Sequence, residues 1–189
     1  VHYVTHSLKH ILPFPQRLAT LHRIAALIHD YDIVALQEVD GGSLRSNFVN
    51  LTEYLARHGG FPHWYDRTNR NLGGIAQHSL GLLSRLRPRQ VEEYSLPGAI
   101  PGRGVLVSRY GEADEPLVVV AMHLALGRRA RERQLGYVAE LIGHYRHVIV
   151  MGDLNCHGDS REVAELVRRT ALREPMHDSP TFPSWRPAR

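Results

Sequence analysis

The sequence predicts a single α+β or layered α/β domain in which two sheets pack face to face and helices cover them. Its 189 residues, 43% of them hydrophobic, are enough for one well-buried core and too few for two comfortable ones. Segments with helical spacing lie near both ends of the chain, and several short apolar runs lie between them. This order differs from the strict alternation of strand and helix that a purely parallel sheet requires.

The first helix is expected just after Pro13 and Pro15, because proline near the first turn of a helix loses no hydrogen bond. Apolar residues then recur at helical spacing, namely Leu18, Leu21, Ile24, Ala25 and Ile28. An apolar run over 32–39 has the length of a strand and stops at a pair of glycines. A second helix is expected over 48–57.

The middle of the chain consists of short β-type runs between Gly and Pro turns. We expect strands over 75–83, 90–95, 103–108 and 116–124, with residues 109–115 as a hairpin loop. A long helix over 129–145, a strand over 148–152 and a shorter helix over 161–172 follow.

The charge of the chain permits a phosphorylated or polyanionic partner without requiring one. The formal net charge is +4, and Lys9 is the only lysine, so arginine supplies nearly all the positive charge. Arginine presents a planar fork that matches phosphate oxygens. Ordinary solvated faces explain most of these arginines equally well; the densest cluster is Arg128, Arg129, Arg131 and Arg133.

No segment approaches the roughly 20 continuous apolar residues that a membrane span requires. The first residues also lack the basic-then-apolar order of a signal peptide. Cys156 is the only cysteine, which excludes an internal disulfide and a cysteine-based zinc site. A single thiol fits a reducing compartment, so the expected location is cytoplasmic.

Polar groups stand at the carboxyl ends of three expected strands. Glu38 ends one apolar run, His123 a second, and Asp153 with Asn155 a third. If these ends lie at one edge of a common core, two acids, an imidazole and an amide meet in one cleft. Such oxygens suit Mg²⁺ or Mn²⁺, which binds one or two protein carboxylates together with substrate phosphate. The metal would polarise a phosphoryl oxygen while a second carboxylate orients the attacking water.

Each of these residues also has a purely structural interpretation. Asp153 and Asn155 are typical of an Asx turn that closes a strand. Glu38 alone would be a solvated acid, and His123 is one of 13 histidines, most of which we expect to be structural. In an extended segment, however, Asp153 and Asn155 point to the same side. The combination of all four residues favours the functional interpretation.

Four segments, taken in order, resemble the endonuclease/exonuclease/phosphatase superfamily, which has the DNase I-like fold. They read Asp32-Ile-Val-Ala-Leu-Gln-Glu-Val-Asp40, Leu80-Gly-Leu-Leu-Ser-Arg85, Val119-Val-Ala-Met-His-Leu124 and Met151-Gly-Asp-Leu-Asn155. The resemblance covers most of the chain. It implies a four-layer α/β/β/α sandwich that hydrolyses phosphodiester or phosphomonoester bonds with a divalent metal.

Position by position, the resemblance implies that Glu38 binds the metal and that His123 hydrogen-bonds the scissile phosphate. It implies that Asp153 and Asn155 position the water and stabilise the transition state. Gln134, with the arginine before it, falls where relatives often carry a structural Arg-Gln pair at the start of a helix.

The chain departs from the family pattern in three places. Leu80 stands where many relatives carry asparagine. The family's first strand, which ends in an asparagine-containing motif, has no counterpart before His2-Tyr3. Its last strand, which bears an Asp-His pair, has none before Arg189. We therefore expect a single domain over 1–189 that lacks the terminal strands at both ends.

The expected function is that of a divalent-metal-dependent phosphoester hydrolase: a phosphodiesterase, a nuclease or a phosphatase. Arg103 is expected to stabilise developing negative charge, and Asn71, in the loop before the strand at 75, to contact the substrate. Nucleic acid, a phospholipid headgroup, an inositol phosphate and a nucleotide all stay open as substrates. The alternative is a non-catalytic scaffold or interaction domain that keeps the fold. Nothing in the sequence predicts a protein partner.

Overall fold

The computed structural model describes residues 14–43, 46, 48–72, 76–98 and 102–173, and for 14–17, 69–72 and 76–78 it describes the backbone only. In chain order the elements are α2 (Phe14–Ile28), β1 (Ile33–Asp40), α3 (Leu51–Gly59), β2 (His63–Leu72), β3 (Ala76–Ser84), β4 (Gln90–Ser95), β5 (Gly104–Tyr110), β6 (Leu117–His123), α4 (Arg128–Ile142), β7 (His147–Asp153) and α5 (Arg161–Arg169). Among these residues, no helix is long and apolar enough to cross a membrane.

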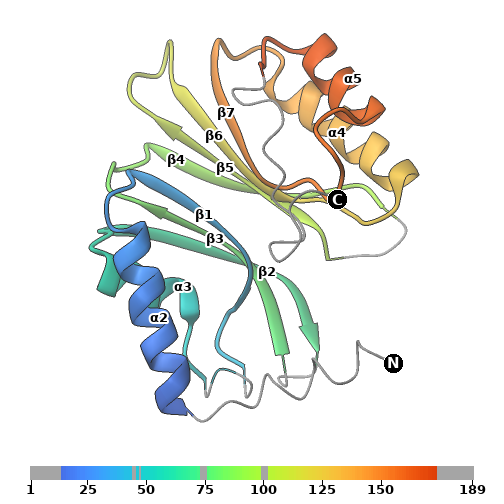
Figure 1. Cartoon of the computed structure of the whole chain (residues 1–189). Helices are drawn as coiled ribbons and strands as arrows, with labels where there is room; N and C mark the ends of the chain where they lie inside the picture. The colour runs from blue at the N-terminus through green and yellow to red at the C-terminus, as the bar shows by residue number, and fades with distance from the viewer. Residues whose placement is uncertain (1–13, 44–45, 47, 73–75, 99–101, 174–189) are drawn as a thin grey trace.

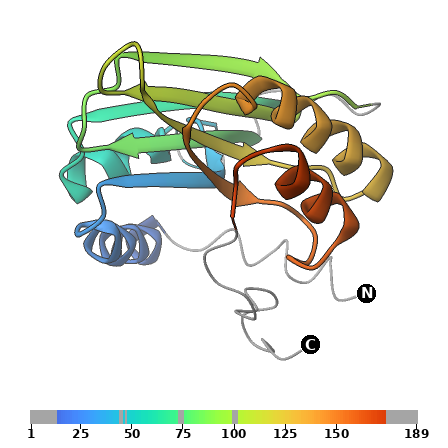
Figure 2. The ribbon, with the colours of Figure 1, turned by 90° about the horizontal axis from the view of Figure 1, so that it is seen from above.

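The strands form two sheets that pack face to face (Figure 1). One sheet has the order β1-β3-β2 and is antiparallel throughout. The other has the order β4-β5-β6-β7, in which β6 and β7 are parallel and the remaining pairs antiparallel. Helices α2 and α3 cover the outer face of the first sheet and α4 and α5 that of the second, as the view from above also shows (Figure 2). The four-layer arrangement is thus confirmed.

Three apolar clusters fill the spaces between the four layers. One joins α4 and α5 to the second sheet, and another joins α2 and α3 to the first. The third lies between the sheets and is built on Leu80, Leu82, Leu106 and Ala121, with Ile33, Ala35, Tyr65 and Val91 packed against it. Alternation along each strand explains this division, since successive side chains point to opposite faces. Leu80, at the position where relatives often have asparagine, is fully buried in the layer between the sheets.

The expected helices and strands are found with small shifts in their bounds. For the helices, the residues at each end explain the shift. Helix α3 begins at Leu51 because the side chain of Asn50 accepts a hydrogen bond from the backbone N–H of Glu53. Helix α4 ends at Ile142, before a glycine, and α5 ends where Thr170 becomes extended. The hairpin between β5 and β6 is also confirmed.

Strand β2 was missed, and with it the position of Asn71, which we expected in a loop. Asn71 lies inside β2 and pairs with Gln77 of β3. The segment is rich in polar residues, and β2 is at the edge of its sheet, so it lacks the apolar run that marks a central strand. The Asn71 side chain is outside the part that the structure describes.

Candidate active site

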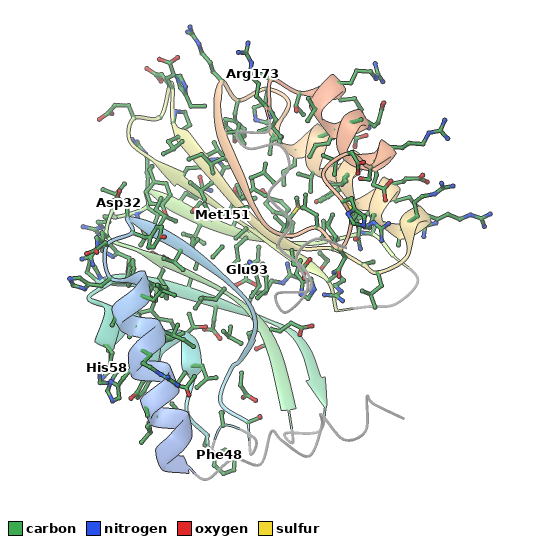
Figure 3. The ribbon with its side chains drawn as sticks, in the orientation of Figure 1. Asp32, Phe48, His58, Glu93, Met151 and Arg173 are labelled. Carbon is green, nitrogen blue, oxygen red and sulfur yellow. The ribbon has the colours of Figure 1, made fainter. Side chains whose placement is uncertain are left out.

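His123 and Asp153 lie side by side at the carboxyl ends of the parallel strands β6 and β7. They are register partners, and His123 Nε2 is 3.8 Å from Asp153 Oδ2. The His123 side chain is 6% exposed and that of Asp153 is 53% exposed. A buried imidazole therefore stands next to a carboxylate that water and substrate can reach. Figure 3 labels Met151, which precedes Asp153 on β7.

Gly152 allows the two strand ends to approach each other. Its φ is +139°, and a Cβ placed on it would lie 1.9 Å from the carbonyl oxygen of Met122. No side chain fits in that space, and the backbone conformation also favours glycine. The glycine before Asp153 thus permits the close pairing of β6 and β7 at the site.

Asn155 belongs to a turn and not to the end of strand β7, which corrects the extended geometry that we expected. Its φ is +51°. Its backbone N–H donates to Asp153 Oδ1 at 2.9 Å, which makes the Asx turn named above as the structural alternative. Its side-chain Nδ2 donates to the carbonyl oxygen of Leu124 at 2.8 Å, and Leu124 N donates to Asp153 O at 2.9 Å. These bonds hold the turn after β7 against the end of β6.

Glu38 lies on a β-bulge in β1. Leu36 pairs with Gly81 and Val39 with Ser79, so β1 has one more residue between these pairs than β3 has. Glu38 has φ +56° and an exposed side chain. A bulge re-aims a side chain, and a non-glycine residue at positive φ is strained. The backbone at Glu38 is therefore irregular and strained, and its side chain is exposed.

Asp40 organises the loop that follows Glu38, a role that the sequence did not reveal. It is 2% exposed and accepts hydrogen bonds from Gly42 N, from Ser43 N and Oγ, and from Ser46 Oγ, at 2.6–3.0 Å. Burial alone would raise the pKa of Asp40, but these hydrogen bonds outweigh it and hold the pKa below its usual value. Asp40 is thus a buried carboxylate that fixes the backbone beyond β1. The Gly-Gly-Ser sequence after an aspartate was the available signal.

Gln134 connects the loop that follows β4 to the loop that follows β6, in agreement with the structural role expected for it. It is 1% exposed. Its Oε1 accepts from Ala125 N at 2.9 Å, and its Nε2 donates to Pro97 O at 3.2 Å. Ala125 follows His123 closely, so Gln134 fixes the backbone that leaves the site.

The basic residues contribute less to an open phosphate site than their number suggests. Within the cluster at the start of α4, Arg131 bonds to buried Glu162 at 2.7 Å, and Arg128 pairs with exposed Glu132. Arg103 is half-buried immediately before β5, and its carbonyl accepts a hydrogen bond from Leu96 N at 3.0 Å. Arg131 thus has a structural partner, while Arg103 stays a candidate for substrate contact.

Strand β1 packs against β6 and β7, and Figure 1 shows the three strands running in roughly the same direction, so their carboxyl ends lie toward one side. Over the described residues, no group of three or more His, Cys, Asp and Glu side chains is gathered tightly enough to hold a metal. Mg²⁺ does not need such a group, because it binds through one or two carboxylates and retains several waters. Glu38 and Asp153 both carry exposed carboxylates, the type of donor that a hard, hydrated cation prefers.

The sequence matches the Endonuclease/Exonuclease/phosphatase family over residues 11–189. The chain belongs to this family, and the resemblance seen in its four segments is confirmed. A comparison with curated protein sequences gives no match.

Solved structures of the same fold include two proteins of this family. The one from Leptotrichia buccalis has a TM-score of 0.64 and 13% identity, over 80% of this chain and 66% of that one. The one from Bacteroides thetaiotaomicron has a TM-score of 0.62 and 16% identity, over 82% and 60%. A mannosyl-6-phosphatase from Bacteroides thetaiotaomicron has a TM-score of 0.59 and 17% identity, over 82% and 62%. The chain thus spans 60–66% of these structures, and the likeness establishes the fold.

Proposed function

We propose that this protein is a divalent-metal-dependent phosphoester hydrolase. The observation that carries the proposal is the pairing of His123 with Asp153 at 3.8 Å, beside the Asn155 turn. Membership of the family and the phosphatase activity named for a protein of the same fold support it.

In this proposal Glu38 would hold Mg²⁺ or Mn²⁺ through its exposed carboxylate. The bound metal would supply charge neutralisation at the phosphoryl oxygen. Asp153 orients the attacking water as a general base, and its exposure leaves room for that water. His123 donates to the phosphoryl oxygen, and Arg103 adds positive charge for the transition state. Asn155 keeps the Asp153 carboxylate in position through its backbone N–H.

The test measures hydrolysis of bis(p-nitrophenyl) phosphate and p-nitrophenyl phosphate by the full chain with Mg²⁺, with Mn²⁺ and with a chelator. We expect Asp153→Ala and Glu38→Ala each to lower kcat/KM by about 100-fold or more. Asp114→Ala, in the exposed β5–β6 hairpin, is the matched control and keeps full activity. Equal activity in the wild type and both site variants would contradict the proposal. No turnover with either metal would favour the non-catalytic scaffold.

Substrate class is decided by a second measurement. Nucleic acid, an inositol phosphate, a nucleotide and a phospholipid headgroup all present the same phosphoester group. Binding of a nucleic acid polyanion releases counterions, so its hydrolysis would fall steeply as salt rises. A monoester of a small sugar or inositol would show a weak dependence on salt. A panel at several salt concentrations therefore separates nuclease from phosphatase activity.

A further inference from the structure

Gln37, the residue before Glu38, carries a buried amide nitrogen that has no partner among the described residues. Its Nε2 is shielded from solvent and makes no hydrogen bond within the part of the chain that the structure describes. Buried polar side-chain atoms in folded proteins are nearly always hydrogen-bonded, and an exception needs an explanation. The family, the bulge and the packing described above do not supply one.

Gln37 lies on β1 next to the residues that pack in the layer between the sheets. Ile33 and Ala35, at alternate positions on the same strand, pack in that layer, and Gln37 is the next alternate position, where the bulge between Leu36 and Val39 begins. Ala121 of β6 packs there too, and His123 lies two residues further on the same face. Gln37 and His123 thus both lie toward the carboxyl ends of their strands, β1 and β6, which run in roughly the same direction (Figure 1).

We propose that Gln37 contacts the substrate by donating a hydrogen bond from Nε2 to a phosphoryl oxygen of the bound phosphoester. The inference rests on the proposed function, since it places Gln37 in the same site. The residue as a whole is half-buried. Because Nε2 makes no bond among the described residues, a turn of the terminal amide about χ3, a broad torsion, exchanges Nε2 with Oε1 without loss of a hydrogen bond from Nε2. A charged phosphate oxygen is the stronger kind of acceptor for this donor.

A merely structural role makes a different prediction. If Gln37 only fills space, replacing it with methionine, an apolar side chain of similar length, removes an unsatisfied donor and leaves ligand binding unchanged. If Gln37 contacts phosphate, the same change leaves the fold at least as stable and weakens phosphate binding. A Gln37→Met variant that is as stable as wild type but binds phosphate more weakly therefore indicates that the amide contacts the ligand.

The experiment compares wild type, Gln37→Met and Gln90→Met, in which an exposed glutamine at the start of β4 is changed in the same way. Titration calorimetry with inorganic phosphate in the presence of Mg²⁺ gives Kd, thermal unfolding gives Tm, and bis(p-nitrophenyl) phosphate gives KM and kcat. For Gln37→Met we expect Kd and KM to rise about tenfold or more, from loss of one charge-assisted hydrogen bond, with Tm equal or higher. Gln90→Met keeps all wild-type values.

The phosphate titration separates this inference from the proposed function. If the wild type binds phosphate but shows no turnover, the proposed hydrolase function is refuted. The Kd of Gln37→Met for phosphate still tests the contact between Gln37 and phosphate. Equal Kd in wild type and Gln37→Met, or no phosphate binding by wild type, overturns the inference. If Gln37→Met lowers Tm, the binding test uses Gln37→Glu in its place. This variant keeps the shape of the side chain and replaces the N–H donor with a negative charge. We expect Gln37→Glu to weaken phosphate binding more than Gln37→Met does, and equal binding overturns the contact.

Discussion

His123 Nε2 and Asp153 Oδ2 are 3.8 Å apart on adjacent parallel strands. This separation exceeds that of a hydrogen bond, so the two groups are neighbours that can share a third group between them. Asp153 is fixed from the other side by the Asn155 N–H, which donates to Oδ1 at 2.9 Å. One carboxylate oxygen is thus used for positioning, while the other faces the imidazole.

The first prediction concerns the dependence of these two residues on each other. His123→Gln and Asp153→Asn should each lower kcat/KM by about 100-fold or more, because in the proposed mechanism both act on the same phosphoryl centre. The double variant should lose much less than the product of the two, since residues that act on one step are not additive. Steady-state kinetics of the four proteins give this cycle. Fully multiplicative losses would show that the two side chains act independently.

The second prediction tests the strain at Glu38. Glu38→Ala keeps a Cβ at positive φ, whereas Glu38→Gly removes it. Both variants lose the carboxylate that the proposed function assigns to the metal. We expect the free energy of unfolding of Glu38→Gly to be about 1 kcal/mol higher than that of Glu38→Ala. The same pair of changes at Glu93, in the extended strand β4, should give the opposite order. Chemical denaturation measures both pairs, and an identical order at the two positions would contradict the strain.

The third prediction concerns the close approach at Gly152. Gly152→Ala should lower the free energy of unfolding by about 3 kcal/mol or more, because the new Cβ meets the Met122 carbonyl and the φ disfavours it. Gly136→Ala is the control, since it lies in the interior of α4 near only the flexible end of Arg169. That change should raise stability by about 0.5–1 kcal/mol. Urea titrations decide; a Gly152→Ala variant of wild-type stability would be inconsistent with this strand pairing.

The fourth prediction uses the lowered pKa of Asp40. A carboxyl whose pKa is lower in the folded than in the unfolded state stabilises the fold above its unfolded pKa, and this contribution disappears as pH falls through the folded pKa. Asp40→Asn should therefore cost about 2–3 kcal/mol at neutral pH, and the difference from wild type should shrink as pH falls below about 4. Unfolding measured from neutral to acid pH tests it, with exposed Asp114→Asn as control. A difference independent of pH would assign the effect to side-chain shape.

The residues themselves predicted most of the elements, because apolar periodicity and turn residues are local properties. The segment over 90–95 became β4 with those bounds, and helix α3 begins where Asn50 caps it. Strand β2 was not predicted, because edge strands need only one hydrogen-bonded neighbour and tolerate polar residues. The extended geometry expected for Asp153 and Asn155 was wrong, since a left-handed residue in a turn leaves no apolar pattern.

The sequence by itself determined the family, the layered α/β architecture and the polar strand ends, because motif order, periodicity and turn residues are properties of the sequence alone. Only the tertiary structure decided how these strand ends meet: the parallel register that pairs His123 with Asp153, the bulge at Glu38, and the Gln37 Nε2 that has no partner among the described residues. Each depends on contacts between segments that are distant in sequence, and local propensity carries no information about which backbone or side chain lies opposite.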